Sequence, residues 1–282
     1  MRYDPGRDLG WLLLRPWVAI PRLVQVLWSL AGLVLVLLLR GGSNDPAVQQ
    51  GLARRILNTL TGLGPCFIKL GQALSTRPDL VRRDWLEELT RLQDDLPAFP
   101  HATALACIRE ELGAPAEELF EEFPDTPIAA ASLGQVYKAR LQGQHWVAVK
   151  VQRPNLTFIL RRDLVLIRAL GVMTAPLLPL NLGFGLGGII DEFGRSLFEE
   201  IDYGLEAANA ERFSALFADN DAVYIPKVER MLSSTRVLTT TWIDGAKMRD
   251  SEELRSQRLD PTALIRTGVI CGLQQLLEFG YF

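Results

Sequence analysis

The chain has 282 residues, which is enough for one large domain or two smaller ones, and its net charge of −3 gives no indication of a nucleic-acid partner. Three cysteines far apart in the sequence argue against a disulfide framework and against a zinc site, and two histidines leave little for a histidine-based metal centre or a Ser-His-Asp triad. We therefore predict no metal site made by this chain alone, although magnesium carried on a nucleotide stays compatible with the composition.

The first forty residues are strongly apolar. Residues 23–39 have the sequence LVQVLWSLAGLVLVLLL, and this length is near the minimum for crossing a hydrocarbon core of about 30 Å. The run is too long for a cleaved signal peptide, and arginines on both sides (Arg22 and Arg40) leave its orientation open. A membrane span, an interfacial or re-entrant hairpin and a buried core helix are the three interpretations. We expect a membrane-associated leader over residues 1–42.

Helices follow the leader. Residues 47–63 and 66–75 are predicted to be helical, with Gly64-Pro65 as the break between them. Lys69 and Gln72 are three residues apart and share a helical face, so both side chains could reach one site. A solvated lysine and a satisfied glutamine explain the same spacing. Two more helices are predicted before the β-region, over residues 84–96 and 101–112.

A β-hairpin is predicted between residues 128 and 152. Val147, Val149 and Val151 alternate with Trp146, Ala148 and Lys150, and Gly143 supplies the turn before them. A small-residue loop, a strand, a turn and a strand bearing one lysine form the arrangement with which a protein-kinase-type fold holds nucleotide phosphates. Here alanines stand where kinases have glycines, and their methyl groups limit how closely the loop backbone can approach a phosphate.

The remaining residues alternate between helix and strand. Residues 156–198 are expected to be apolar helix with a broken middle, and residues 199–213 a polar-faced helix. On that helix Asp202 and Glu206, four residues apart, are expected on one face, where a carboxylate could pair with Lys150; a solvated surface acid is the simpler alternative for each. A strand over residues 236–243 and an amphipathic helix over residues 261–279 complete the prediction.

Five motifs occur in order along the chain and together resemble the UbiB/ABC1/ADCK (AarF-type) family of atypical kinase-like proteins. They are Lys69-Leu70-Gly71-Gln72, the segment from Ala129 to Val136, the segment from Val147 to Pro154, the acidic segment from Glu200 to Asn209, and Trp242-Ile243-Asp244-Gly245. The resemblance covers roughly residues 50–282. It implies an α+β fold in which a protein-kinase-like N-lobe follows a helical N-terminal extension. The implied divisions are a leader (1–42), the extension (43–125), the N-lobe (126–245) and the start of a C-lobe (246–282).

The resemblance also implies roles for single residues. Lys150 corresponds to the strand lysine that contacts phosphates, Glu206 to its helix partner, and Trp242 to Gly245 to the hinge that holds adenine. Glu200 and Asp202 correspond to an acidic motif that engages Lys69 and Gln72 of the extension. The implied nucleotide contacts are Ala129, Ala130, Ala131, Ser132, Val136, Ala148, Lys150, Glu206, Trp242 and Ile243, and the implied regulatory residues are Lys69, Gly71, Gln72, Glu200 and Asp202.

Members of this family support the synthesis or handling of isoprenoid quinones and other lipids at membranes. The resemblance therefore implies ATP or ADP as cofactor and a membrane lipid or isoprenoid quinone precursor as substrate, with quinone-biosynthesis proteins as possible partners and no nucleic acid. It implies an atypical ATPase or small-molecule kinase at a bacterial inner, thylakoid or organellar membrane, with the soluble part on the cytoplasmic or stromal side. The alternative is a pseudokinase, a nucleotide-gated module that binds or presents lipids without transferring phosphate.

The family's catalytic loop and metal-binding aspartate have no counterpart in this sequence. In the family these groups come soon after a segment that resembles the last residues, Glu278 to Phe282. We expect the sequence to be an N-terminal part of a longer protein, or else a natural variant reduced to the N-lobe. Mg²⁺ and phosphoryl transfer are expected only with the catalytic loop present.

Overall fold

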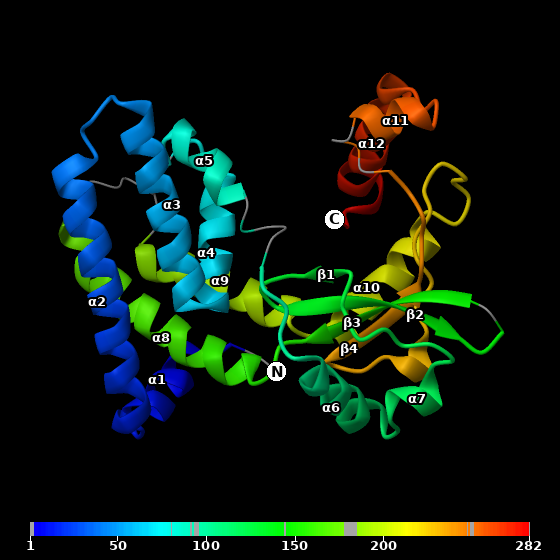
Figure 1. Cartoon of the computed structure of the whole chain (residues 1–282), viewed down its shortest axis with the longest axis horizontal. Coiled ribbons are helices and arrows are strands. Elements are labelled where there is room, and N and C mark those ends of the chain that lie inside the picture. Colours follow the sequence, from blue (N-terminus) through cyan, green and yellow to red (C-terminus); the bar gives the residue numbers. More distant parts are fainter. Residues whose placement is uncertain are drawn as a thin grey trace.

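The structure is a computed structural model that describes residues 3–79, 81–90, 92, 96–143, 145–177, 185–246, 248 and 251–281. A helical bundle and a four-stranded sheet with its own helices lie side by side (Figure 1). This arrangement confirms the predicted α+β class with a kinase-like N-lobe and an apolar N-terminal helix. The bundle consists of α1 (Pro5–Leu13), α2 (Pro16–Arg40), α3 (Pro46–Leu63), α4 (Pro65–Ser75), α5 (Arg83–Thr90), α8 (Leu156–Thr174), the short η2 (Ala175–Leu177) and α9 (Leu186–Glu200).

The sheet half follows a different set of segments. It consists of α6 (His101–Leu112), α7 (Ala116–Leu119), β1 (Ala129–Ala130), β2 (Gly134–Leu141), β3 (His145–Gln152), α10 (Tyr203–Leu216), η3 (Arg230–Leu232) and β4 (Val237–Thr241). The last helices are α11 (Ser251–Ser256), α12 (Pro261–Leu273) and its continuation η4 (Gln274–Phe279), a π-helix. In Figure 1 they lie above the sheet, apart from the bundle.

Local sequence signals fix where several helices begin. Asp4, Asp45, Asp202 and Asp260 each accept a hydrogen bond from a backbone N–H of the helix that follows, which satisfies donors that have no partner inside the helix. Proline opens α1, α2, α3, α4 and α12, where its missing N–H costs nothing. The predicted helices at 47–63, 66–75 and 101–112 are confirmed within a residue.

The sheet is antiparallel throughout, in the order β1-β2-β3-β4. The predicted alternation on β3 is confirmed, because Val147, Val149 and Val151 are buried in a core that α6 and α7 share. The opposite face carries Lys150, which lies in register between Val136 of β2 and Leu238 of β4. Gly143 forms the turn with a φ of +93°, a value that glycine adopts without strain.

The two largest hydrophobic clusters form one core in the bundle and one in the sheet half. The bundle core joins helices that are far apart in sequence, since α8 and α9 pack with α2 to α5, although the hairpin lies between them in the chain. The sheet core lies between the strands and α6. The division of the chain at residues 42, 125 and 245 stays a prediction.

The predicted single helix over residues 199–213 is wrong. α9 ends at Glu200, Ile201 and Asp202 form a corner, and α10 begins at Tyr203. Asp202 is extended (φ −93°, ψ 91°), and its carboxylate accepts hydrogen bonds from the N–H groups of Gly204 (3.1 Å) and Leu205 (3.4 Å). The side chain that was expected to share a face with Glu206 therefore stops one helix and caps the next.

Candidate nucleotide-binding site

Lys150 and Glu206 form a close ion pair between β3 and α10. The Lys150 Nζ donates to both carboxylate oxygens of Glu206, at 2.9 Å and 2.7 Å. Both side chains are partly accessible, with 33% of Lys150 and 42% of Glu206 exposed. A strand lysine oriented by a helix glutamate and open to solvent has the geometry that a kinase-type site uses to place a cation at nucleotide phosphates.

The Tyr203 ring packs against the ammonium of this pair. The Lys150 ammonium lies 4.5 Å from the centre of the Tyr203 ring, a distance typical of a cation–π contact. Tyr203 is completely buried, and burial, with the carboxylates of Glu206 and Glu200 as lesser causes, raises the pKa of its phenol. The first turn of α10 therefore gives Lys150 both a counter-charge and a platform.

Gly134 makes room for Tyr203. A Cβ atom at position 134 would lie 2.6 Å from the Tyr203 hydroxyl oxygen and 2.6 Å from the Val151 carbonyl oxygen, so only glycine fits. The Tyr203 hydroxyl is buried, and no hydrogen-bond partner for it lies among the residues that the structure describes. Sequence reasoning assigned no role to Tyr203, although its position three residues before Glu206 placed it on the same face of a helix.

The alanine-rich loop is short and braced by backbone contacts. Ala129 and Ala130 form β1 and pair with Val136 and Gln135 of β2. The Ala131 N–H donates to the Gly134 carbonyl (2.8 Å), which leaves it directed within the loop and not outward. Ser132, predicted to contact nucleotide, is buried.

Arg153 holds this loop in place from the end of β3. Its Nε donates to the Ala131 carbonyl (3.0 Å), and its backbone N–H donates to the Leu133 carbonyl (2.9 Å). A second guanidinium nitrogen donates to the Pro97 carbonyl (2.7 Å). Sequence reasoning did not single out this arginine, and its three carbonyl partners lie too far apart in the chain for spacing to reveal them.

The residues predicted to hold adenine lie further along the same sheet face. Ala148 is in register with Lys138 and Thr240, one row away from Val136 and Lys150. Trp242 follows β4, and its N–H donates to the Trp146 carbonyl (2.9 Å). The Lys138 ammonium lies 4.5 Å from the Trp242 ring, so a cation and an indole stand at this end of the face. Ile243 is next in the chain and is 44% exposed.

An ion pair joins the helical extension to the α9–α10 corner beside the site. Lys69 of α4 pairs with Glu200, the last residue of α9. Gln72 does not join it: its amide donates to the Leu92 carbonyl (2.6 Å) inside the bundle. Of the expected four-residue cluster the structure shows the Lys69–Glu200 pair, and Asp202 caps α10. Gly71 contributes packing, because a Cβ there would lie 2.5 Å from a methyl group of Leu92.

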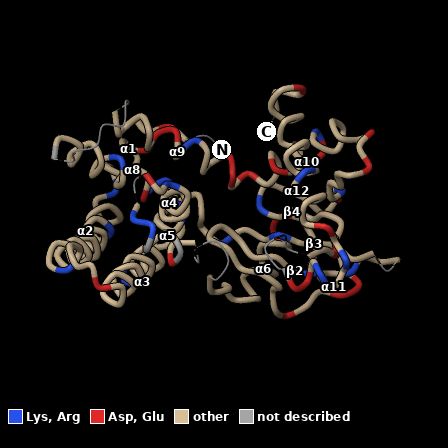
Figure 2. Tube along the Cα trace, turned by 90° about the horizontal axis from the view of Figure 1, so that it is seen from above, with Lys and Arg blue, Asp and Glu red and all other residues tan. Residues whose placement is uncertain are grey.

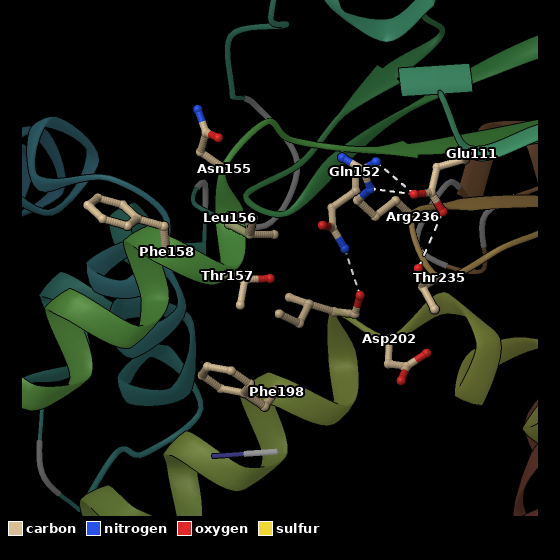
Figure 3. A pocket seen from close by; sticks show the side chains of 11 residues that line it. Glu111, Gln152, Asn155, Leu156, Thr157, Phe158, Phe198, Asp202, Thr235 and Arg236 are labelled. Carbon is tan, nitrogen blue, oxygen red and sulfur yellow. Dashed lines mark hydrogen bonds and ion pairs between the residues drawn. The ribbon is translucent and has the colours of Figure 1, made fainter. Parts of the chain in front are cut away.

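A hollow of about 450 Å³ lies where the end of β3 meets α8, α9 and the α9–α10 corner (Figure 3). Gln152 donates to the Ile201 carbonyl (2.6 Å) across it, and Glu111 accepts from Arg236 (2.7 Å) and Thr235 (3.3 Å). Lys150 is not part of its lining. Gln152, Glu111 and Arg236 hold protein groups to one another there, and Asp202 of the predicted acidic motif also lines the hollow; since Lys150 lies outside it, we do not assign it the nucleotide.

Metal binding receives no support of its own from the geometry. Within the described ranges, no group of three or more His, Cys, Asp or Glu side chains lies close enough together to hold a metal ion. The predicted Mg²⁺ belongs to a catalytic loop that has no counterpart in this sequence and stays a prediction.

Comparison with known proteins identifies the relatives of this chain. A family model described as the ABC1 atypical kinase-like domain matches residues 91–282. The uncharacterised protein slr1919 of Synechocystis is 46% identical over 282 residues, which cover 100% of this chain and 50% of that protein. The Arabidopsis thaliana protein named ACTIVITY OF BC1 COMPLEX KINASE 1, chloroplastic, is 45% identical over 239 residues, which cover 84% of this chain and 35% of that protein.

The chain thus spans half or less of the length of these two relatives. A solved structure of a Mycobacterium tuberculosis protein in complex with erythromycin is 34% identical and covers 63% of this chain and 44% of that chain, with a TM-score of 0.45.

Proposed function

Since the chain belongs to the ABC1 atypical kinase-like family, we propose that it supplies the ATP-binding lobe of an atypical kinase or ATPase that acts on isoprenoid quinone or lipid metabolism at a membrane. The observation that carries this proposal is the partly exposed Lys150–Glu206 pair between β3 and α10. ATP or ADP supplies the phosphates, and the ammonium of Lys150 offsets their negative charge.

The surrounding residues fit a nucleotide. Val136 and Ala148 give a small, apolar surface beside Lys150 on the same sheet face, which suits a flat base. Trp242 and Ile243 follow β4 at the edge of that surface, where a hinge is expected. Val136, Ala148 and Lys150 come from β2 and β3, whose fixed register supports a site that needs no rearrangement of these strands.

The alanine-rich loop favours a small-molecule or lipid acceptor, or hydrolysis, over a protein acceptor. The Ala131 N–H is occupied by Gly134 and the loop is braced by Arg153, so it cannot fold down over phosphates as a glycine-rich loop does. Lys69 also ties the extension to the α9–α10 corner beside the site. An extension held there obstructs the approach of a protein substrate.

The first test is nucleotide binding. Lys150→Ala removes the ammonium that we expect to offset the charge of the phosphates. Hydrogen bonds to charged groups are worth about 1.5–3 kcal/mol, so we expect ATP affinity to fall by roughly tenfold to a hundredfold. Titration calorimetry with ATP and with ADP measures the loss. Lys227→Ala is the matched control, because this exposed lysine lies on the same lobe and its backbone, not its ammonium, joins Thr241.

Unchanged ATP affinity in Lys150→Ala would refute the assignment of the site. A second measurement separates enzyme from pseudokinase: Mg²⁺-dependent ATP turnover by a protein of the length of the relatives. Turnover that Lys150→Ala abolishes supports the enzyme, whereas tight ATP binding without turnover supports the nucleotide-gated module.

A further inference from the structure

The outer side of α2 is an uninterrupted apolar stripe. Its residues recur every three or four positions and so lie along one face of the helix. They are Trp17, Ile20, Val24, Trp28, Ala31, Leu35 and Leu38, which the structure leaves exposed. We call these seven residues the outer stripe. Trp28 is 82% exposed and Leu38 79%, and Leu13 and Leu14 of the preceding turn extend the apolar surface with 70% and 76%.

The inner side of the same helix is fixed to the bundle by a buried ion pair. Arg22 is 8% exposed and donates to both oxygens of the Asp163 carboxylate, at 3.0 Å from Nε and 2.7 Å from Nη2. The same guanidinium donates to the Leu63 carbonyl, the last residue of α3. Val26 and Leu33 continue this side as completely or nearly completely buried residues. Charged and apolar contacts together hold one full side of α2 against α3 and α8.

The segment before α2 is fixed to the same helices. Asp8 of α1 is buried and forms an ion pair with Arg161 of α8 (3.0 Å). Tyr3 donates a hydrogen bond to Asp191 of α9 (3.0 Å), which Arg168 of α8 also binds (2.7 Å). The apolar leader is therefore built into the bundle at several points along its length.

This packing is incompatible with a membrane span. Among the described residues α2 is the one helix long and apolar enough to cross a bilayer, with a mean hydropathy of 2.2 over its most apolar 18 residues, a test of length and composition alone. However, α3 lies alongside α2 (Figure 1) and carries Gln50, Arg54 and Asn58. A span by α2 would carry these polar side chains to the depth of the hydrocarbon core, where they find no water.

The charges on and beside α2 favour an anionic membrane as the partner of the outer stripe. α2 contains no Asp or Glu, and Figure 2 shows its tube tan apart from arginine blue. One hollow beside the stripe is lined by Trp28 of α2 together with Arg55 of α3. A second hollow, nearer the C-terminal end of α2, is lined by Arg40 of α2 together with the same Arg55. Tryptophan prefers the bilayer interface and arginine binds lipid phosphates, so this combination fits the surface of an anionic membrane.

We propose that α2 lies in the plane of an anionic phospholipid bilayer, with the outer stripe inserted to the level of the acyl-chain boundary and the inner side still paired to Asp163. The stripe extends from residue 17 to residue 38, about 32 Å along the helix axis, which is long enough for stable interfacial binding. This inference deepens the membrane part of the proposed function and rests on it. Nucleotide binding is measured separately in the absence of vesicles, so that failure of either idea is recognisable.

The depth of two tryptophans distinguishes this arrangement from a span. Trp28 is the middle residue of Pro16–Arg40, so in a span it would lie near the bilayer centre, about 16 Å deeper than Trp17 along the helix. In the in-plane arrangement both indoles lie at one shallow depth. Lipids brominated at different depths, in phosphatidylcholine–phosphatidylglycerol vesicles, quench the fluorescence of tryptophans that lie at the same depth. The quenching lost in Trp17→Phe or in Trp28→Phe is the contribution of that ring.

We expect shallow bromines to quench Trp17 and Trp28 equally in the full chain. We also expect Trp28→Glu with Leu35→Glu to weaken vesicle binding by about tenfold or more, since two inserted apolar side chains become charged. The matched control is Tyr224→Glu with Met231→Glu, two exposed apolar residues (67% and 92%) of the sheet half, which should bind like the parent. Quenching of Trp28 by deep bromines overturns the proposal in favour of a span. Vesicle binding that is unaltered in the Trp28/Leu35 variant overturns it too. So does a dimer in which the outer stripe is buried and which does not bind vesicles.

Discussion

Gly71 shows how one missing methyl group lets two helices meet. A Cβ at this position would lie 2.5 Å from a Leu92 methyl and 2.7 Å from a Leu60 methyl, both in the packed bundle core. The motif around Lys69 and Gln72 therefore needs glycine for packing as well as for any role near the nucleotide. A sequence pattern alone gives no way to separate these two causes.

Substituting Gly71 tests the packing role. Alanine favours helix by up to about 1 kcal/mol, but overpacking a dense core costs about 1–3 kcal/mol, so we expect Gly71→Ala to lower the free energy of unfolding by about 1–2 kcal/mol. Urea denaturation followed by circular dichroism measures it. Gly51→Ala in α3 is the control, because its Cβ meets nothing within 4 Å and should stabilise the chain. Equal effects of the two variants would contradict the packing argument.

Glu111 links α6 to the segment before β4 and makes stability depend on acid pH. Burial acts to raise the pKa of this carboxyl, but hydrogen bonds from Ser234, Arg236 and Thr235 and the charge of Arg236 outweigh it, so its pKa is lowered from the ordinary 4.5. A lowered folded-state pKa means that the pairing stabilises fully above about pH 4.5 and that this contribution disappears as pH falls through the folded-state value.

Glu111→Gln should therefore cost about 1–3 kcal/mol at neutral pH and progressively less below pH 4.5, as measured by the gap between its thermal unfolding and that of the parent. Glu110→Gln is the control, since Glu110 pairs with the same arginine (2.9 Å) but is 68% exposed and should change stability by less than about 0.5 kcal/mol. A gap for Glu111→Gln that stays constant from pH 7 to pH 3 would show that its carboxylate charge is not what stabilises the fold.

Helix α2 illustrates what periodicity predicts about an element and what it omits. Its existence and length follow from the apolar run, and the prediction of an apolar N-terminal helix is confirmed. The sequence left open whether this helix spans, lies flat or is buried, because Arg22 has its partner Asp163 141 residues away. Only the tertiary arrangement shows that the arginine at the edge of the run faces inward.

Breaking that buried pair should release the helix. Asp163→Asn leaves Arg22 buried without a counter-charge, and removal of one partner of a buried pair typically costs about 3–5 kcal/mol. We expect faster proteolysis within residues 1–42, which mass spectrometry of the fragments measures. We also expect a lower unfolding temperature, which circular dichroism measures. Asp79→Asn, in an exposed pair with Arg77, is the control and should behave like the parent. Unchanged protection of the leader would show that the apolar side of α2 holds it without Arg22.

The α9–α10 corner shows the opposite case, an element boundary that the pattern missed. Residues 199–213 are polar enough and long enough for one helix, and nothing in helical periodicity marks Asp202 as a stop. Its extended backbone and its two hydrogen bonds to the next turn decide the matter. Asp is a common N-cap residue, so the sequence also allowed a helix start after Asp202. The four-residue spacing of Asp202 and Glu206 favoured a single helix instead.

For the molecule as a whole, the sequence was most informative about the sheet half. Alternation and one glycine turn predicted β2, β3 and the orientation of Lys150, and the family motifs predicted Glu206 as its partner. The bundle was harder, because its core joins α8 and α9 to helices that precede the hairpin. Contacts between segments a hundred residues apart follow from packing, which a single sequence does not display.

The corner at Ile201 and Asp202 also joins a helix of the bundle to a helix of the sheet half over only two residues. On one side α9 belongs to the bundle that carries α2; on the other, α10 carries Tyr203 and Glu206, which position the Lys150 ammonium. Two residues offer few torsions to absorb a rotation, and Gln152 clamps the Ile201 carbonyl to β3. With so few free torsions, Ile201 and Asp202 restrict how far α9 can rotate against α10, the helix that holds the counter-charge of Lys150.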